Sequence, residues 1–213
     1  QNRGGRGVKG TSTHNDDIVT QMINMNTHDD LLFFTNFGKV YRLKGYQIPE
    51  YGRTAKGLPV VNLLNLDKNE YVKSMINISK EDINEGNIKG TYLFFATKNG
   101  LVKRVPVEEF ESIRQSGKIA ITLKENDELV TVKLTSGSDE ILIASSNGKL
   151  VRFEEDNVRP MGRTASGVRG INTDGGIVIG LTTNKQLQFI MVVTEKGNVN
   201  MSPIEEYRKS NRG

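Results

Sequence analysis

Hydrophobic residues along the chain occur in short runs, and each run is followed by a turn that contains glycine. After the turn, apolar and basic residues alternate, and this unit recurs at residues 31–42, 92–104, 141–153 and 190–201. Glycine supplies the positive φ angle of a tight hairpin turn, and β-branched and aromatic residues with a period of two favour strands. The pattern therefore predicts four β-hairpins.

Two further features follow the hairpins at similar distances. The first is a short loop with glycine and basic residues, found at residues 51–57, 113–118 and 161–167, with related sequences at 1–7 and 210–213. The second is a strand that is predicted to begin near Ile18, Tyr71, Leu129 and Ile177. Short helical turns are predicted at 106–110 and 203–207, with proline at their first position.

A unit of roughly 50 residues with a hairpin and more strands is typical of a propeller blade. We expect an all-β fold, a single β-propeller domain over residues 1–213 with about four blade repeats. The expected division is a partial blade at 1–30, repeats at about 31–90, 91–140 and 141–188, and a partial blade at 189–213. A β-sandwich with similar hairpins is the alternative.

Composition narrows the possible functions. The 213 residues (23.7 kDa) include no cysteine and two histidines, which excludes disulfide scaffolds, thiolate metal sites and cysteine nucleophiles. His14 and His28 are separated in polar surroundings, so surface roles are expected. No apolar stretch approaches the roughly 20 residues of a membrane-spanning helix. Because the chain begins with Gln1, we expect it to be part of a longer protein.

Basic residues are concentrated in particular parts of each repeat. They lie on the second hairpin strand (Arg42, Lys44, Lys103, Arg104, Lys149, Arg152) and in or beside the following loop (Arg53, Lys56, Arg114, Lys118, Arg163, Arg169). Equivalent positions of a ring of blades share one circle, so this bias predicts a positive belt. The net charge of +4 permits a polyanionic partner such as DNA or RNA. Simple solvation of exposed strands is the alternative interpretation.

The opening loop combines two arginines with three glycines and is followed by a lysine (Arg3, Gly4, Gly5, Arg6, Gly7, Lys9). A guanidinium offers planar donors that match phosphate oxygens, and glycine lets backbone N–H groups approach the same anion. We interpret this loop as a phosphate clamp.

Residues 1–7, Gln-Asn-Arg-Gly-Gly-Arg-Gly, resemble the GyrA box of the C-terminal domain of the DNA gyrase A subunit. The resemblance extends along the chain through Phe-Phe-Thr-Asn at 33–36, Phe-Phe-Ala-Thr-Lys at 94–98, Lys-Ile-Ala-Ile at 118–121, Gly-Arg-Thr-Ala at 162–165 and the sequence at 207–213. Asn2 departs from the family, which usually has a basic residue there. The family's domain normally has six blades, whereas this chain has about four repeats.

The resemblance implies a β-pinwheel, a propeller in which neighbouring blades exchange strands. It also implies that the outer rim binds and bends duplex DNA, so that the parent type IIA topoisomerase introduces negative supercoils. The implied partners are double-stranded DNA, the rest of the gyrase A subunit and the gyrase B subunit, in the bacterial cytoplasm with the nucleoid and without a membrane. No cofactor, metal site or catalytic residue is expected here, because ATP and Mg²⁺ would act elsewhere in the enzyme.

Three other functions fit parts of the sequence. The C-terminal domain of the topoisomerase IV homologue has a degenerate box, which the intact arginines and glycines at 3–7 disfavour. A propeller that serves as a scaffold for protein–protein interaction would need an apolar patch or a patch suited to an acidic partner. An enzyme with a site in the central channel would need acid, base and nucleophile residues that converge.

Overall fold

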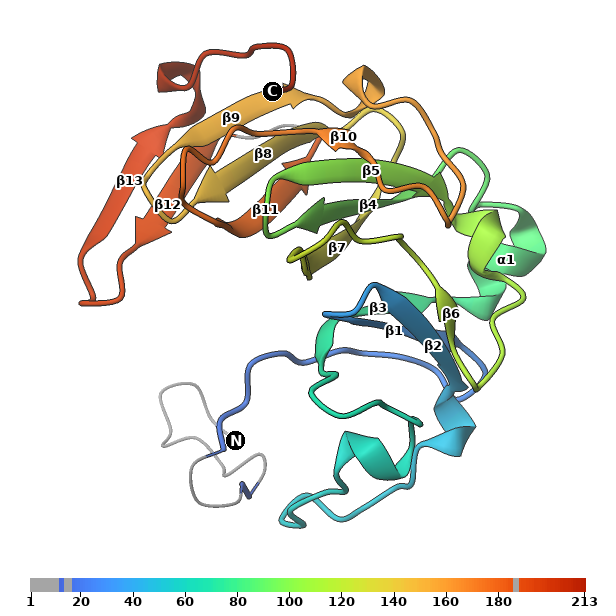
Figure 1. Ribbon diagram of the computed structural model, residues 1–213. Helices are drawn as coiled ribbons and strands as arrows, with labels where there is room; N and C mark the ends of the chain where they lie inside the picture. Colours follow the sequence, from blue (N-terminus) through green and yellow to red (C-terminus); the bar gives the residue numbers. More distant parts are fainter. Residues whose placement is uncertain (1–11, 14–16, 186–187) are drawn as a thin grey trace.

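The computed structural model describes residues 12–13, 17–185 and 188–213, and its strands form antiparallel sheets that follow one another along an arc (Figure 1). In the first sheet the strand order is β3 (Val72–Ile78), β1 (Asp30–Thr35), β2 (Lys39–Lys44) and β6 (Lys118–Ile119). In the second it is β10 (Val168–Arg169), β5 (Leu101–Pro106), β4 (Tyr92–Thr97) and β7 (Leu129–Thr135). The third sheet contains β11 (Val178–Asn184), β8 (Glu140–Ser145) and β9 (Leu150–Glu154), and the fourth contains β12 (Phe189–Val193) and β13 (Val199–Pro203).

The four predicted hairpins are confirmed as β1–β2, β4–β5, β8–β9 and β12–β13. Each turn contains a glycine with positive φ, namely 74° at Gly38, 91° at Gly100, 81° at Gly148 and 80° at Gly197. Residues other than glycine rarely adopt this backbone conformation, because their Cβ atom would clash. The glycine in each repeat therefore sets the place of the turn and, with it, the pairing register of the two strands.

Neighbouring repeats exchange a strand. β6 follows β4 and β5 in the chain but pairs with β2 of the preceding sheet, and β10 pairs in the same way with β5. The turn glycines take part in this docking. The carbonyl oxygen of Gly38 accepts hydrogen bonds from the backbone N–H groups of Ala120 (2.8 Å) and Ile121 (3.1 Å), and the carbonyl of Gly100 does the same for Gly170 and Ile171. This exchange confirms the expected pinwheel form of the propeller.

Hydrophobic cores lie between successive sheets, and a further core packs the first sheet against the segments around Ile23 and Leu64. β3, β7 and β11 form the inner edges of their sheets, and β7 contacts both β3 and β11, whereas β6 and β10 lie at the opposite, outer edges. Between the first two sheets, the rings of Phe34 and Phe95 meet edge to face at 5.5 Å, and Phe110 completes the cluster. A second core around Phe94 and Phe153 joins the second and third sheets. These cores fix the angle between blades and so the curvature of the arc.

Helical structure is scarce among the described residues, as predicted. One α-helix, α1 (Lys80–Glu85), was not predicted, and the 3₁₀ turns are η1 (Gly45–Gln47), η2 (Val60–Asn62), η3 (Val107–Phe110), η4 (Glu155–Asn157) and η5 (Ile204–Glu206). Pro106 and Pro203 each end a strand in an extended conformation and immediately precede η3 and η5. The predicted helical turns therefore began one residue too early, because each proline lies just before its turn and not at its first position.

The strand predicted at Ile18 is absent among the described residues, and its side chain is exposed. β3, β7 and β11 each pair with the first strand of a hairpin that precedes them. Residues 1–17 contain no apolar run that could supply such a hairpin. The same local sequence pattern therefore forms a strand in three repeats and not in this segment.

We predict that Gly38→Ala destabilises the fold more than Gly148→Ala. Both changes place a side chain at positive φ, which costs about 1–2 kcal/mol. A Cβ atom at Gly38 would also lie 2.6 Å from the carbonyl oxygen of Ile121, whereas at Gly148 it would meet open space. Crowding in a packed region adds about 1–3 kcal/mol. Urea unfolding of the two variants measures the difference, and equal losses would show that the docked strand adjusts freely.

Candidate nucleic-acid interface

The loops that lead to the outer edge carry most of the exposed basic residues that the sequence singled out. Arg53, Lys56, Arg114 and Arg169 are exposed, and Arg163 is partly exposed. Lys118 is partly buried and donates a hydrogen bond from Nζ to the carbonyl of Ser112 at 2.9 Å. Lys149 is exposed but forms an ion pair with Asp174. Successive loops therefore present cations along one edge of the arc.

Some basic residues of these loops were missed by the sequence analysis. All of them are exposed and lie either just before the loop at 161–167 or in the C-terminal segment after η5, and they are Arg159, Arg208, Lys209 and Arg212. The segments that begin at Pro106, Glu154 and Pro203 can be aligned. The same position is occupied by Arg159 in the second segment and by Arg208 in the third, whereas the first segment has Glu111 there, so this alignment could have identified both arginines.

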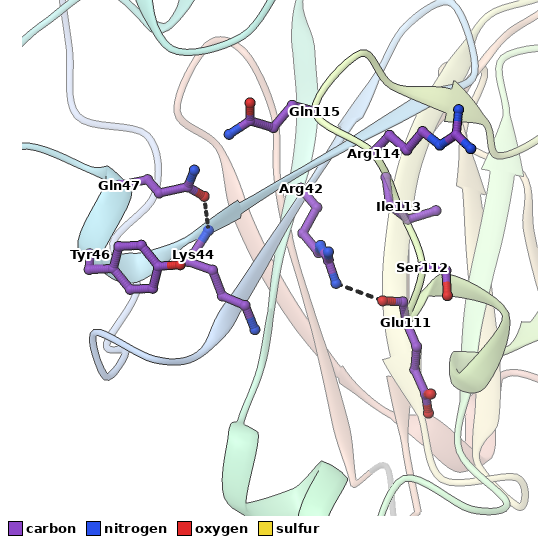
Figure 2. Close-up of a pocket in the computed structure, with 9 residues that line it drawn as sticks. All are labelled: Arg42, Lys44, Tyr46, Gln47, Glu111, Ser112, Ile113, Arg114 and Gln115. Atoms are coloured by element: carbon purple, nitrogen blue, oxygen red, sulfur yellow. Dashed lines mark hydrogen bonds between the residues drawn. The ribbon is translucent and has the colours of Figure 1, made fainter.

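A basic hollow lies between the first hairpin and the outer loop of the second repeat (Figure 2). Its lining residues are Arg42, Lys44, Tyr46, Gln47 and residues 111–115. The Nη1 atom of Arg42 donates a hydrogen bond to the carbonyl of Glu111 at 2.6 Å, and the Nζ atom of Lys44 lies 2.8 Å from Oδ1 of Asp30. Arg114 belongs to the loop on the opposite side. The hollow thus combines three cations from two repeats.

Arg42 belongs to a set of equivalent arginines that also includes Arg104 and Arg152. They occupy the same register position of their hairpins, opposite Leu32, Phe94 and Leu142 respectively. Nε of Arg104 donates to the carbonyl of Val158, and Nη1 of Arg152 donates to the carbonyls of Ile204 (3.1 Å) and Tyr207 (3.2 Å). Each arginine therefore holds the outer segment of the next repeat.

Acidic and aromatic side chains on the same sheets support these arginines. The guanidinium of Arg104 lies 4.5 Å from the ring centroid of Tyr92, and its Nη1 atom is 3.7 Å from Oε2 of the buried Glu155. Arg152 bonds Glu140 at 2.8 Å. Burial acts to raise the pKa of Glu140, but hydrogen bonds from Lys209 and Arg152 outweigh it and lower that pKa. Arg104 and Arg152 therefore each have an acidic partner on the same sheet or in the next outer segment.

The predicted placement on an exposed belt was wrong for Lys103 and Arg104, whose side chains are buried, and Arg152 is largely covered. The exchanged strand and the outer loop of the next repeat cover the second hairpin strand. Sequence spacing correctly placed these residues at equivalent positions of successive hairpins. It could not show that the outer segment of the next repeat covers those positions.

Lys103 is fully buried beneath the loop at 161–167. Its Nζ atom donates hydrogen bonds to the carbonyls of Gly162 (3.2 Å) and Arg163 (2.6 Å) and lies 5.2 Å from the ring centroid of Phe95. Burial lowers the pKa of Lys103 to about 7, the Arg163 guanidinium adds to this effect, and Glu109 partly opposes it. Tyr41 occupies the equivalent position of the first hairpin, where burial and the neighbouring Glu70 raise its pKa.

The predicted clamp, Arg3, Gly4, Gly5, Arg6, Gly7 and Lys9, lies outside the described residues. Within the described part of the chain, no group of three or more metal-ligating side chains comes together. In the same part, no helix is long and apolar enough to cross a membrane.

We predict that Arg104→Met destabilises the fold by about 3–5 kcal/mol, because it leaves the buried carboxylate of Glu155 without its counter-ion. Arg114→Met serves as the matched control. Its side chain is exposed on the outer loop, so the change in unfolding free energy should stay within about 0.5 kcal/mol. Denaturant unfolding measures both values. A small loss for Arg104→Met would contradict its role in holding the next repeat.

Comparisons with known proteins agree with the fold. The family model described as DNA gyrase C-terminal domain, beta-propeller, matches residues 1–24, 29–79, 91–136, 139–184 and 188–213. The DNA gyrase A subunits of Staphylococcus epidermidis ATCC 12228 and Staphylococcus aureus MRSA252 are 46% and 48% identical over 216 residues, which covers 100% of this chain and 24% of each relative. The chain thus spans about a quarter of the length of these relatives.

Solved structures show the same fold. The C-terminal domain of DNA topoisomerase IV aligns with a TM-score of 0.79 at 29% identity, over 88% of this chain and 57% of that one. The C-terminal domain of DNA gyrase A aligns with a TM-score of 0.70 at 22% identity, over 89% of this chain and 59% of that one. The family model, which matches most of the chain, and the relatives that are 46–48% identical over its whole length show that the chain belongs to the DNA gyrase C-terminal domain family.

Proposed function

We propose that this domain binds duplex DNA along its outer loops and bends it. The observation that carries the proposal is the recurrence of exposed basic residues in equivalent loops of successive blades, including Arg53, Arg114 and Arg163. Duplex DNA presents phosphates at regular intervals, and cations placed at intervals along a curved surface favour a curved path of the duplex. Backbone contacts of this kind tolerate any base sequence.

The hollow beside Arg42 is suited to one of these phosphate contacts (Figure 2). Lys44 and Arg114 approach it from different repeats, so a phosphate held between them would contact two adjacent blades at once. Gln47 and Gln115 add amide groups that can donate hydrogen bonds. Binding at this position would therefore favour the relative placement of blades that the structure has.

Within the whole protein, we propose that the bent DNA lets the parent gyrase introduce negative supercoils. The partners of this domain would be the rest of the gyrase A subunit and the gyrase B subunit, with ATP and Mg²⁺ acting elsewhere in the enzyme. The bacterial cytoplasm, with the nucleoid, would be its location. The identity to named DNA gyrase A subunits over the whole chain supports this assignment.

The alternatives from the sequence analysis have less support. The identity of 46–48% to named DNA gyrase A subunits over the whole chain favours gyrase over topoisomerase IV as the parent. A protein scaffold would use an apolar face, and β12 and β13 carry exposed apolar side chains, but the feature that recurs in successive blades is the exposed basic residues of the outer loops.

We predict salt-sensitive binding of this chain to duplex DNA, measured by gel shift on duplexes of increasing length. If about 6 to 10 phosphates are neutralised, affinity should fall by about 10³- to 10⁵-fold between 50 and 200 mM salt. Arg114→Met should weaken binding to all sequences and reduce the slope of log affinity against log salt by about 1. Affinity that is insensitive to salt, or that depends strongly on base sequence, would contradict binding by the outer loops.

We predict that the double change Arg3→Ala and Arg6→Ala reduces DNA bending more than it reduces binding to a short duplex. Only two of many phosphate contacts are lost, but bending 20 to 30 base pairs by 40 to 90° costs about 1–6 kcal/mol, which anchored contacts must offset. Fluorescence transfer between the duplex ends reports bending. A double variant that bends DNA as well as the parent chain would exclude this loop from the mechanism.

A further inference from the structure

The outer loop at 161–167 is held at both of its ends by the preceding repeat. At its start, Lys103 bonds the carbonyls of Gly162 and Arg163 from beneath. At its end, Gly167 has φ +92° and packs against the backbone of Val102 so closely that no Cβ atom would fit. The Nη1 atom of Arg163 in turn donates to the carbonyl of Ile119 at 3.1 Å.

The loop at 51–57 provides an internal comparison, because Gly-Arg-Thr-Ala-x-Gly occurs at 52–57 and at 162–167. Both loops make the same turn, in which the N–H of Ala55 bonds the carbonyl of Gly52 (2.9 Å) and the N–H of Ala165 bonds that of Gly162 (3.2 Å). The turn is therefore encoded within the loop. The hold on the loop from below is supplied by Lys103, which belongs to a different repeat.

We propose that Lys103 is a positioning residue for DNA binding, which fixes the loop at 161–167 so that Arg163 and its neighbours meet the phosphates in a preset arrangement. The proposal rests on the proposed DNA-binding function. Lys103 itself is buried and cannot touch DNA without a change of structure. Lys103 affects affinity by keeping the loop at 161–167 in its binding conformation before DNA arrives. Each side chain that must instead be immobilised on binding costs free energy and weakens the complex.

The charge of Lys103 also couples this loop to pH. The charged groups that face its ammonium are Arg163, which disfavours the protonated form, and Glu109, which favours it, while the ring of Phe95 packs against it. A DNA phosphate at the loop would neutralise Arg163 and raise the pKa of Lys103 from its value of about 7 in the free chain. Because the complex then binds the proton more tightly, affinity is greatest below about pH 7 and falls as the pH rises above it.

The test measures duplex affinity between pH 6 and 9 at fixed salt for the parent chain, Lys103→Met and Lys103→Gln. Lys103→Met removes both hydrogen bonds and the charge, and it should weaken binding at pH 6 by about 2- to 12-fold. Lys103→Gln keeps an amide donor for the loop carbonyls and should lose less affinity. Both variants should lack the parent's additional fall in affinity above pH 7. The histidines are unchanged in all variants, so the difference isolates Lys103.

Lys133→Met is the control. Lys133 is exposed on β7, at the edge of the sheet opposite β10, which follows the loop at 161–167. This variant should keep the parent's pH profile. Circular dichroism shows which variants are folded, and Lys103→Gln decides the outcome if Lys103→Met does not fold. Parental affinity and pH dependence in a folded Lys103 variant would overturn the proposal and leave the proposed function intact. Failure of the parent chain to bind duplex DNA would overturn both.

Discussion

The docking of each exchanged strand onto the preceding hairpin is the interaction on which the rest of this structure depends. The exchanged strands are only two residues long, so their ladders supply few hydrogen bonds. The carbonyls of Gly38 and Gly100 add two bonds each, and a Cβ atom at these glycines would lie 2.6 and 2.4 Å from a backbone oxygen of the donated segment, so a larger residue would crowd it. In the described residues, strand exchange thus joins the first repeat to the second and the second to the third, and it positions the outer loops that lead to β6 and β10.

The basic residues of the domain divide into two groups with different tasks. Arg104 and Lys103 lie inside and bond the backbone of the following repeat, whereas Arg114 and Arg169 remain on the surface. A buried cation is costly unless it is paired or bonded, so the inner group has acidic, aromatic or carbonyl partners. Positive charge therefore contributes both to the assembly of the blades and to the potential of their outer edge.

The sequence predicts the hairpins and the blade repeat well, because the Gly38 and Gly100 turns and the alternation that follows them are local signals. It fails where a segment depends on a partner distant in sequence. Ile18 has the local pattern of an inner strand but lies in no strand of the described residues, and Lys103 has the sequence context of an exposed lysine but is covered by residues 161–167. Helix α1 was missed because its signals are a serine cap at Ser79 and a left-handed glycine at Gly86, on a segment with a weak apolar pattern.

Hydrogen exchange with and without a duplex tests the central claim, that strand exchange places the outer loops of successive blades on one DNA path. Bound DNA should slow exchange in the loops at 113–118 and 159–169 together, while exchange in the inner strands β3, β7 and β11 stays unchanged. Protection of the inner strands, or of β12 and β13 without these loops, would contradict the claim.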